Sequence, residues 1–535
     1  MNNYQHFRYL TKRTPIYGRR GMVATTQPLA AQAGLDMLKK GGNAIDAAIA
    51  AAACLPVVEP TSNGLGSDAF ALIWTGGKLY GLNASGPAPR TLSIGALRAR
   101  GLSAVPTTGL TPVTVPGAPA AWAACSRRFG RLPLPSVLEP AITYAAEGYP
   151  VSPVVAANWQ RAYAQFKAKL RGDMFASWFD TFAPNGRVPR AGEIWSSPEM
   201  ADSLSKIATT AAGAFYHGEL AEAIDRFSRK YEGFIRKADL AAFVPEWVEP
   251  ICTSYRGYDV WELPPNGQGL VVLMALGTLA HFQIGSKPDA ETYHRQIEAL
   301  KLAFSDGKAC ITDPREMNGE VAALLSAGYA ASRAQQIGSQ ALHPAPGTLP
   351  TGGTVYLAAA DGEGNMVSFI QSNYAGFGSG IVIPGTGISL QNRGSDFSLN
   401  EADANCLKPG KRTYHTIIPG FLTKAGKAVG PFGVMGGYMQ PQGQLQVLSN
   451  TIDCLMDPQA ALDAPRWQWL HDKTVMVEPD FPLEAARELA ARGHDIRIAL
   501  DGSSFGRGQI IWRDAVTGVL TGASESRADG IVAAW

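Results

Sequence analysis

Residues 44–55, AIDAAIAAAACL, restrict the fold more than any other stretch of this chain. They are small and apolar on almost every side of a helix. Asn43 precedes them and Asp46 follows it by three residues, which is the pattern of a capping box at the start of a helix. A helix without a polar face has to be packed on both of its sides. The chain therefore needs a core that covers this helix from two directions.

The rest of the chain divides into two parts of different character. A short strand is expected over residues 21–26, with Thr26 capping the helix that follows it. Helical patterns dominate residues 115–340, whereas strands and turns are expected to dominate residues 354–535. Between these parts, residues 338–353 read GSQALHPAPGTLPTGG, and their proline and glycine content predicts an exposed, extended linker without periodicity.

Composition and charge limit the partners that the chain can be expected to have. Of its 535 residues, 46% are hydrophobic and only 17% are charged, which excludes a disordered, highly charged chain. The 47 Lys and Arg residues nearly balance the 45 Asp and Glu residues. This balance gives no electrostatic reason to expect nucleic acid or an anionic membrane as a partner.

No compartment signal is evident in the sequence. The first 20 residues carry positive charges without the apolar run of a secretory signal, and no stretch of 18 uncharged apolar residues follows. The six cysteines are scattered and form no CxxC pair, so we expect reduced, buried thiols. Together these features predict a cytoplasmic protein.

The stretch from residue 352 to residue 380 carries the most chemistry. TVYLAAA and MVSFIQS predict two antiparallel strands around the turn DGEGN. If the loop spans residues 361–365, Thr354 lies opposite Ser372 with both hydroxyls on one face. A loop of four residues would instead place Thr354 opposite Gln371.

Thr354 also follows a Gly-Gly pair, which tolerates strained backbone angles. A threonine in this place can attack the carbonyl of Gly353, and cleavage would free an α-amino group on Thr354. With a pKa of about 7.7–8.0, such an amine is partly neutral at pH 7 and can accept the hydroxyl proton. One residue would then supply both nucleophile and base.

Other catalytic motifs are weak. The GxSxG match at residues 502–506 is followed by a predicted strand and by no histidine, so we interpret it as a turn. GFGSG at residues 376–380 lacks the full dinucleotide fingerprint. No HExxH, HxxxH or Cys–His cluster has metal-ligand spacing, so no metal and no cofactor are expected. Composition alone leaves a non-catalytic binding role open.

The chain resembles the γ-glutamyltransferase family of self-processing N-terminal-nucleophile hydrolases. The resemblance spans roughly residues 20–530 and rests on motifs in the family's order: GGNAIDAAIA (41–50), VVEPTSNGLGSDAF (57–70), LPPNGQG (263–269), HRQIEALKLAFSD (294–306), TVYLAAADGEGN (354–365), LQNRGSDFS (390–398), PGKR (409–412) and GVMGG (433–437). It implies an α/β fold of four layers, αββα. It also implies cleavage between Gly353 and Thr354 into a large chain, residues 1–353, and a small chain, residues 354–535.

The resemblance assigns roles to individual residues. Thr354 matches the nucleophile, and Ser372 matches the hydroxyl that bonds it. Gly436 and Gly437 match the glycine pair whose N–H groups form the oxyanion hole, a contribution of about 2.7–4 kcal/mol for each donor. Asp396 matches the residue that holds the substrate amine in γ-glutamyl enzymes. The implied assembly is a dimer of two-chain units.

Departures from the family pattern concern the substrate. The arginine that clamps the substrate α-carboxylate in γ-glutamyl enzymes is Ser85 here, and the paired serines near it are His415 and Thr416. An asparagine becomes Tyr374, and a neutral glutamine becomes Arg393. One anion clamp is therefore lost, while a cation and a bulky ring are gained nearer the nucleophile.

This pattern suits a small acid amide, because Arg393 can bind a carboxylate through two parallel hydrogen bonds. The subgroup resembled is oxamate amidohydrolase, which implies hydrolysis of oxamate to oxalate and ammonia. Three alternatives stay open: a γ-glutamyl substrate such as glutathione, a bulkier amide, and an unprocessed binding relative. Arg393 could instead pair with Asp396, and Arg90 could replace the lost clamp from another direction.

Overall fold

The computed structural model describes residues 13–317, 320–344 and 353–535 of this chain. Its centre consists of two seven-stranded antiparallel sheets. The first sheet has the order β21 (Ile531–Ala534), β2 (Gly21–Thr25), β10 (Gly353–Asp361), β11 (Met366–Tyr374), β3 (Asp68–Thr75), β4 (Lys78–Ala84) and β7 (Glu246–Val248). The second has the order β1 (Ile16–Gly18), β20 (Leu520–Ser524), β19 (Arg507–Arg513), β15 (Lys427–Met435), β14 (Gly420–Lys424), β9 (Tyr258–Glu262) and β8 (Ile251–Tyr255).

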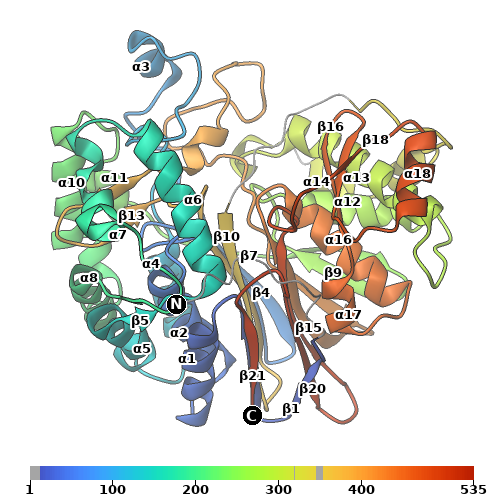
Figure 1. Ribbon diagram of the computed structural model, residues 1–535, viewed down its shortest axis with the longest axis horizontal. Helices are drawn as coiled ribbons and strands as arrows, with labels where there is room; N and C mark the ends of the chain where they lie inside the picture. Colours follow the sequence, from blue (N-terminus) through green and yellow to red (C-terminus); the bar gives the residue numbers. More distant parts are fainter. Residues whose placement is uncertain (1–12, 318–319, 345–352) are drawn as a thin grey trace.

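Helices cover the outer face of each sheet, one set on the left and one on the right in Figure 1. The first sheet is covered by α1 (Pro28–Lys39), α2 (Ala44–Val58), α4 (Ala118–Phe129), α5 (Leu134–Glu147), α6 (Pro153–Lys169), α7 (Ala176–Phe182), α8 (Pro198–Thr209), α9 (Gly213–Tyr216), α10 (Glu219–Lys230) and α11 (Lys237–Ala241). The second is covered by α12 (Gly269–Leu279), α13 (Ala290–Cys310), α16 (Met439–Ile452), α17 (Pro458–Asp463) and α18 (Leu483–Ala491).

The remaining elements lie at the edges of these layers. They are α3 (Ile94–Ala99), α14 (Glu320–Leu324), α15 (Ala327–Ala334), β5 (Tyr149–Pro150), β6 (Ile194–Trp195), β12 (Ile381–Ile383), β13 (Ile388–Leu390), β16 (Trp467–His471), β17 (Thr474–Val477), β18 (Asp495–Ile498) and short 3₁₀ turns at Asp173–Phe175, Pro184–Gly186, Pro314–Glu316 and Arg393–Asp396. Strands β16, β17 and β18 form a small mixed sheet of their own.

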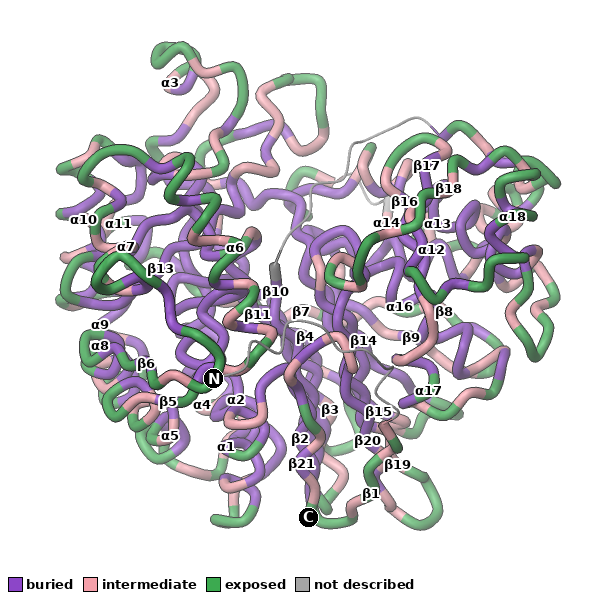
Figure 2. The backbone as a smooth tube through the Cα atoms, viewed as in Figure 1, coloured by how far each residue is buried: buried purple, intermediate pink, exposed green. Residues whose placement is uncertain are grey.

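A third apolar core joins the two sheets face to face. Phe70 and Tyr356 of the first sheet pack in one cluster with Phe421 and Ile511 of the second. The strands at this contact are almost wholly buried, as Figure 2 shows for the centre of the molecule. The predicted four-layer αββα fold is therefore confirmed, and each of the three interfaces between layers has its own apolar core.

The capping box that opens α2 is present as predicted. The side chain of Asn43 accepts hydrogen bonds from the N–H groups of Ile45 and Asp46, and the Asp46 carboxylate accepts one from the N–H of Asn43. Every residue of α2 is buried. The expectation for Thr26 was wrong, because its hydroxyl donates to the buried Glu59 carboxylate and α1 begins after Gln27 without a side-chain cap.

The division into a helical part and a strand part was too simple. Strands β7, β8 and β9 lie inside the region that was expected to be helical, and α16, α17 and α18 lie in the region that was expected to hold strands and turns. Helix α16 has no apolar stripe to detect, since its sequence, MQPQGQLQVLSNTI, alternates glutamine with other residues. Its buried glutamines bond backbone carbonyls instead, as Gln444 does with Ile418 at 3.0 Å.

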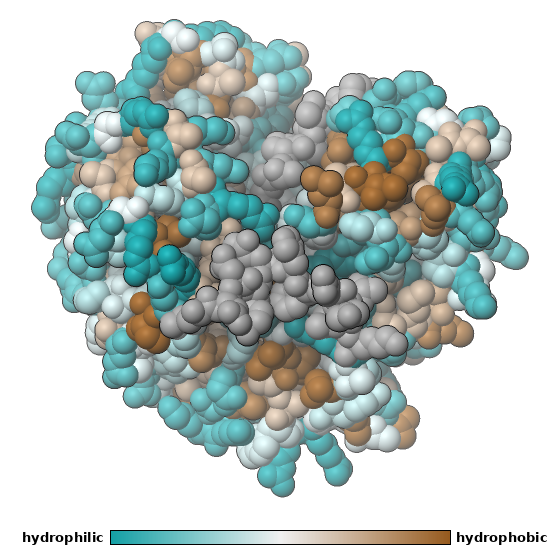
Figure 3. Space-filling model, in the orientation of Figure 1, coloured by the Kyte–Doolittle hydropathy of each residue, from teal (hydrophilic) through white to brown (hydrophobic). Residues whose placement is uncertain are grey.

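Cysteine usage and surface character agree with part of the expectation. All six cysteines are free, but Cys252 is exposed and Cys310 is half-buried. Within the described residues, no helix is both long and apolar enough to cross a bilayer. The face drawn in Figure 3 is mainly hydrophilic, with hydrophobic side chains in separate groups.

Both sheets contain strands from before and from after Thr354, paired side by side. In the first sheet, β10 and β11 lie between β2 and β3, and in the second sheet β14 lies beside β9. The two predicted chains would therefore share one hydrogen-bonded body. Residues 345–352 of the predicted linker lie outside the described residues.

Candidate active site at the end of the central hairpin

Thr354 lies near the start of β10, beside β11. The ladder pairs Ala360 with Met366 and Val355 with Gln371, as the five-residue loop predicts. The register shifts between Gly353 and Val355, so Thr354 lies in a local irregularity. Its side chain nevertheless meets the expected partner: Thr354 Oγ1 is 3.1 Å from Ser372 Oγ. The alternative in which Thr354 faces Gln371 is excluded.

Backbone and side-chain groups fix the position of these two hydroxyls. The N–H of Tyr374 donates to Ser372 Oγ at 2.8 Å. Ser372 Oγ is the acceptor in this contact, so its own hydroxyl proton points toward another group. Gln440 Nε2 lies 3.5 Å from Thr354 Oγ1. Tyr374 itself has φ +74°, a left-handed conformation that costs a non-glycine residue about 1–3 kcal/mol. The backbone is thus strained two residues beyond Ser372.

Gly436 and Gly437 form the turn between β15 and α16, four and three residues before Gln440. Their φ angles are +139° and +60°, in the region that favours glycine. A Cβ on Gly436 would lie 3.2 Å from the Cα of Gly506, so the two backbones approach closely here. Strand β15 packs against β10, and Gln440 just after the turn reaches Thr354, so the turn lies near the nucleophile strand. That its N–H groups face a developing oxyanion stays a prediction.

Arg393 is the most unusual residue of the site, because its guanidinium is buried yet makes a single hydrogen bond within the described part of the chain. Its Nε lies 3.9 Å from Asp68 Oδ2, an ion-pair distance without a hydrogen bond. Its side chain is 1% exposed, and its Nη1 donates to Thr416 Oγ1 at 2.8 Å. The guanidinium lies over the ring of Tyr374, 4.0 Å from the ring centre. Among the described residues, its Nε and Nη2 groups have no hydrogen-bond partner. Two parallel donors are therefore available for a planar acceptor.

Asp396 is close to Arg393 but does not satisfy it. Arg393 Nη1 is 3.7 Å from Asp396 Oδ2, an ion-pair distance without a hydrogen bond. The other oxygen of Asp396 accepts a bond of 2.6 Å from the Tyr374 hydroxyl. Burial raises the pKa of Asp396, and the positive charges of Lys308 and Arg393 oppose that rise. The Arg393–Asp396 ion pair, which the sequence suggested as an alternative to substrate binding by Arg393, is thus present. It still leaves Arg393 Nε and Nη2 without a hydrogen bond within the described residues.

Lys308 brings a second positive charge to the same place. It comes from the last turn of α13, bonds the Tyr438 hydroxyl, and lies 3.8 Å from the centre of the Tyr438 ring. Burial lowers the pKa of Lys308 to about 8, while the carboxylate of Asp396 opposes that shift. Two cations, Arg393 and Lys308, therefore lie among the buried carboxyl groups of Asp396 and Asp68, and burial raises the pKa of both carboxyl groups.

His415 and Ser85 are both fully engaged with protein groups. His415 Nε2 lies 3.0 Å from the buried Asp68 carboxylate, and the N–H of Ile417 donates to His415 Nδ1. Burial lowers the pKa of His415 well below its usual value, so the ring is neutral at pH 7. The Ser85 hydroxyl bonds Asn83 at 2.7 Å. Neither residue offers a free cation to a substrate carboxylate.

An open cleft of about 530 Å³ lies beside the turn that contains Gly436 and Gly437. It is lined by Gly436 and Met435, by Ala375 and Asn392 on the nucleophile side, and by polar side chains at its mouth: Asn158, Arg161, Gln165, Lys169, Gln468, Ser503, Ser504 and Arg507. Arg393 and Asp396 are not part of its lining. The site therefore has a buried cluster of charged side chains and, separately, an open polar cleft.

Sequence reasoning missed several members of this site. Lys308 and Gln440 come from α13 and α16 over the second sheet and Asp68 from β3 of the first sheet, and only the packing of the fold brings them near Thr354 and Arg393. Asp68 lies opposite Ser372 on β3, and burial raises the pKa of its carboxyl to about 7. Arg90, in contrast, is exposed and lines another cavity with Arg412.

Comparison with known proteins agrees with this geometry. Residues 30–535 match the family model described as gamma-glutamyltranspeptidase. The chain belongs to this family. It is 38% identical to the glutathione hydrolase-like YwrD proenzyme of Bacillus subtilis and 34% identical to the oxamate amidohydrolase proenzyme of Klebsiella pneumoniae, each over 96% of this chain and 98% of the relative. Its structure resembles the crystal structure of a cephalosporin acylase from Bacillus halodurans, with a TM-score of 0.97 and 59% identity over 100% of this chain and 99% of that one.

Membership of the γ-glutamyltranspeptidase family identifies the chain as an enzyme, a self-processing amidohydrolase. The family resemblance stated from the sequence is therefore confirmed. The relatives differ in the substrates that their names give, so family membership leaves the substrate open. The roles of Thr354, Ser372, Gly436 and Gly437, and the exact cleavage point, stay predictions.

Proposed function

We propose that this protein cleaves itself before Thr354 and then hydrolyses amides whose acyl group ends in a carboxylate, with oxamate as the first candidate. The observation that carries this proposal is the buried Arg393 guanidinium with two unused donors. A buried charged donor without a partner is costly, and a substrate carboxylate would satisfy it. The product carboxylate in the oxamate case is oxalate, and the leaving group is ammonia.

Self-cleavage begins at the bond between Gly353 and Thr354. The Thr354 hydroxyl attacks the Gly353 carbonyl carbon, the C–N bond breaks, and the hydroxyl proton passes to the Thr354 nitrogen, which becomes a free amine. Water then hydrolyses the resulting ester, which releases the carboxylate of Gly353 and restores the hydroxyl. The strained backbone at Tyr374, which pairs with Gly353, supports a role for this end of the hairpin in the step.

In substrate hydrolysis the freed amine acts as the base. Thr354 Oγ1 attacks the amide carbon while the amine takes its proton, and the oxyanion lies against the N–H groups of Gly436 and Gly437. The amine passes the proton to the departing nitrogen, which leaves an acyl ester on Thr354. Water, deprotonated by the same amine, hydrolyses this ester. Ser372 orients the nucleophile throughout, 3.1 Å from its oxygen.

A second candidate is an acylase that removes a short acid acyl group from a bulky amine. The cleft of about 530 Å³ beside Gly436 favours it, because ammonia needs no such space whereas a large amine does. Both candidates bind the acyl carboxylate at Arg393 and differ only in the leaving group. A γ-glutamyl substrate fits less well, since its α-carboxylate would meet the neutral Ser85.

A comparison of four amides tests the proposal. We expect oxamate and N-phenyl oxamate to be hydrolysed with higher kcat/KM than acetamide, which lacks the carboxylate, and γ-glutamyl anilide. The ratio between the first two distinguishes the small from the bulky leaving group. Arg393→Gln should raise KM for oxamate by about tenfold to hundredfold, because a hydrogen bond to a charged group contributes about 1.5–3 kcal/mol.

Arg393→Lys is the matched control, because it keeps the charge and loses the planar fork. Its KM is expected between those of the wild type and Arg393→Gln. A higher kcat/KM for γ-glutamyl anilide than for oxamate, or oxamate kinetics unchanged in Arg393→Gln, would contradict the proposal.

A further inference from the structure

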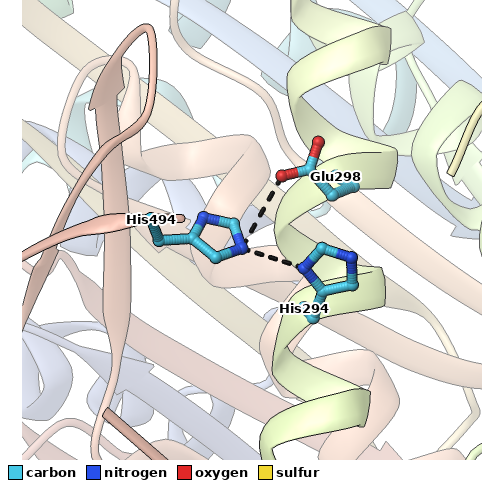
Figure 4. Close-up of side chains that lie close together, drawn as sticks. All are labelled: His294, Glu298 and His494. Carbon is cyan, nitrogen blue, oxygen red and sulfur yellow. Dashed lines mark hydrogen bonds and ion pairs between the residues drawn. The ribbon is translucent and has the colours of Figure 1, made fainter. Parts of the chain in front are cut away.

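A cluster of buried polar side chains lies on α13, outside the site described above. His294 and Glu298 are one turn apart on this helix, and His494 reaches them from the segment between α18 and β18 (Figure 4). His294 Nδ1 is 2.9 Å from His494 Nε2, which in turn is 3.7 Å from Glu298 Oε1. All three side chains are fully buried.

These three residues have the donor types of a metal site, and their ligand atoms lie within 4.8 Å of one another. A fourth residue already supplies the positive charge, however. Lys301 Nζ bonds Glu298 Oε1 at 2.7 Å, and both side chains are 0% exposed. A metal ion bound to Glu298 would have to displace this ammonium group. The cluster is therefore electrically balanced as it stands, which favours a role other than metal binding.

The cluster instead holds one particular segment of the chain, residues 338–343, which we call the pre-cleavage segment. His294 Nε2 is 2.9 Å from the carbonyl oxygen of Gly338. Glu298 Oε2 accepts a bond of 3.2 Å from the N–H of Leu342, and Lys301 Nζ donates one of 3.1 Å to the carbonyl of Leu342. A carbonyl oxygen only accepts, so His294 carries a proton on Nε2 and its Nδ1 can accept from His494.

Groups from beyond Thr354 hold the same segment from the other side. The N–H of Ala341 donates to the carbonyl of Arg492 at 2.8 Å, and the His343 ring bonds Asp472 in the turn between β16 and β17. Leu342 is followed by ten residues before Gly353. Since a chain spans at most about 3.3–3.6 Å per residue, fixing Leu342 limits the positions that Gly353 can reach.

We infer that His294, Glu298, Lys301 and His494 form a docking site for the pre-cleavage segment, which positions the Gly353–Thr354 bond for self-cleavage. This inference rests on the cleavage proposed above. Anchoring the chain at Leu342 leaves ten residues between the anchor and Gly353 at the start of β10. A shorter connection loses less conformational entropy when its ends are brought together. His294, Glu298 and Lys301 are positioning residues, since none contacts the bond that breaks.

The test compares a double variant with a matched control. Glu298→Leu/Lys301→Met removes both partners of the buried pair together, which avoids leaving one charge unpaired. The control, Asp306→Leu/Arg333→Met, removes another ion pair of α13 that does not contact the pre-cleavage segment. Leu342→Pro is a second variant, because it deletes the N–H that bonds Glu298 and leaves α13 intact.

Two readouts are needed. Hydrogen exchange of peptides covering residues 338–344 is measured in a Thr354→Ala background, in which self-cleavage is removed, and the time course of chain splitting is measured by gel with Thr354 in place. We expect both variants to raise exchange at Ala341 by at least about tenfold, the double variant to do so at Leu342 as well, and both to slow splitting severalfold, with the control unchanged.

Unchanged exchange, or faster exchange with an unchanged splitting rate, overturns the inference. A stoichiometric metal ion whose removal by a chelator raises exchange in the same peptides also overturns it, because the cluster would then be a metal site. A wild-type protein that never splits contradicts the proposed function instead, so the two failures are distinguishable.

Discussion

Arg393 and Thr354 show how differently two residues of one site can be predicted. The proximity of Thr354 to Ser372 follows from counting residues around one local loop, and the distance of 3.1 Å between the two hydroxyl oxygens agrees with it. The unused donors of Arg393 could not be predicted, because they depend on where Thr416, Asp396 and Tyr374 lie across the fold. Lys308 was missed for the same reason, since it reaches the site only from the end of α13.

Replacing Ser372 tests the nucleophile geometry. Ser372→Ala should lower kcat by about two- to tenfold, because one hydrogen bond contributes about 0.5–1.5 kcal/mol net. The fold should remain intact, which circular dichroism can check. Steady-state hydrolysis of oxamate measures the effect, with Ser368→Ala as a control on the same strand, where the hydroxyl bonds Tyr356 and not Thr354. Wild-type kcat in Ser372→Ala would show that this contact is not used.

The charge on Lys308 predicts a pH dependence of binding. Its pKa is lowered to about 8, so the ammonium is present below that pH and is lost as the pH rises through it. KM for a carboxylate substrate should therefore rise above pH 8, by roughly three- to tenfold. The freed amine of Thr354 titrates in the same range but gains basicity as it loses its proton, so its effect falls on kcat.

Lys308→Met distinguishes the titration of the Lys308 side chain from that of the freed Thr354 amine. The variant should show a raised KM at pH 7 and no further rise above pH 8, while its kcat profile stays like that of the wild type. A KM profile in Lys308→Met that still rises above pH 8 would assign the titration to another group.

At the level of secondary structure, features that depend on neighbouring residues alone could be predicted, whereas those that depend on tertiary partners could not; the Thr26 cap failed because its hydroxyl bonds the distant Glu59. The capping box of α2 is set by residues three apart, so it could be read from the sequence. Helix α16 could not, because its buried glutamines are satisfied by carbonyls of other segments, such as Gln442 with Trp469. Strands β7 to β9 were missed because they are short, with five residues or fewer each.

The capping box makes a prediction about stability. Asn43→Ala should lower the free energy of unfolding by about 0.5–2 kcal/mol, because two N–H groups at the start of a fully buried helix lose their acceptor. Ser326→Ala is the matched control, as it removes the cap of the more exposed helix α15. Denaturant unfolding measures both. An equal or smaller loss in Asn43→Ala than in Ser326→Ala would show that this cap is not important for α2.

At the scale of the whole molecule, the layered fold and the proposed cleavage have to be compatible. The need to pack α2 on both sides predicted layers, and the family resemblance supplied their number and order. Strands from before and after Thr354 pair with one another in both sheets, so a cut before Thr354 would leave the hydrogen-bonded ladders and three apolar cores intact. The cut chains should therefore remain associated without a disulfide, consistent with six free cysteines. Cytoplasmic location and pairing of two-chain units stay predictions.

The identity of the new N-terminus tests the central claim most directly. Purified protein should consist of two chains, and N-terminal sequencing of the smaller one should begin Thr-Val-Tyr-Leu, the residues from Thr354 onward. Thr354→Ala should remain a single chain and hydrolyse no amide, because it lacks both the nucleophile and the freed base. A wild-type protein that hydrolyses oxamate or another amide while still a single chain, or a small chain that begins at another residue, would contradict the account.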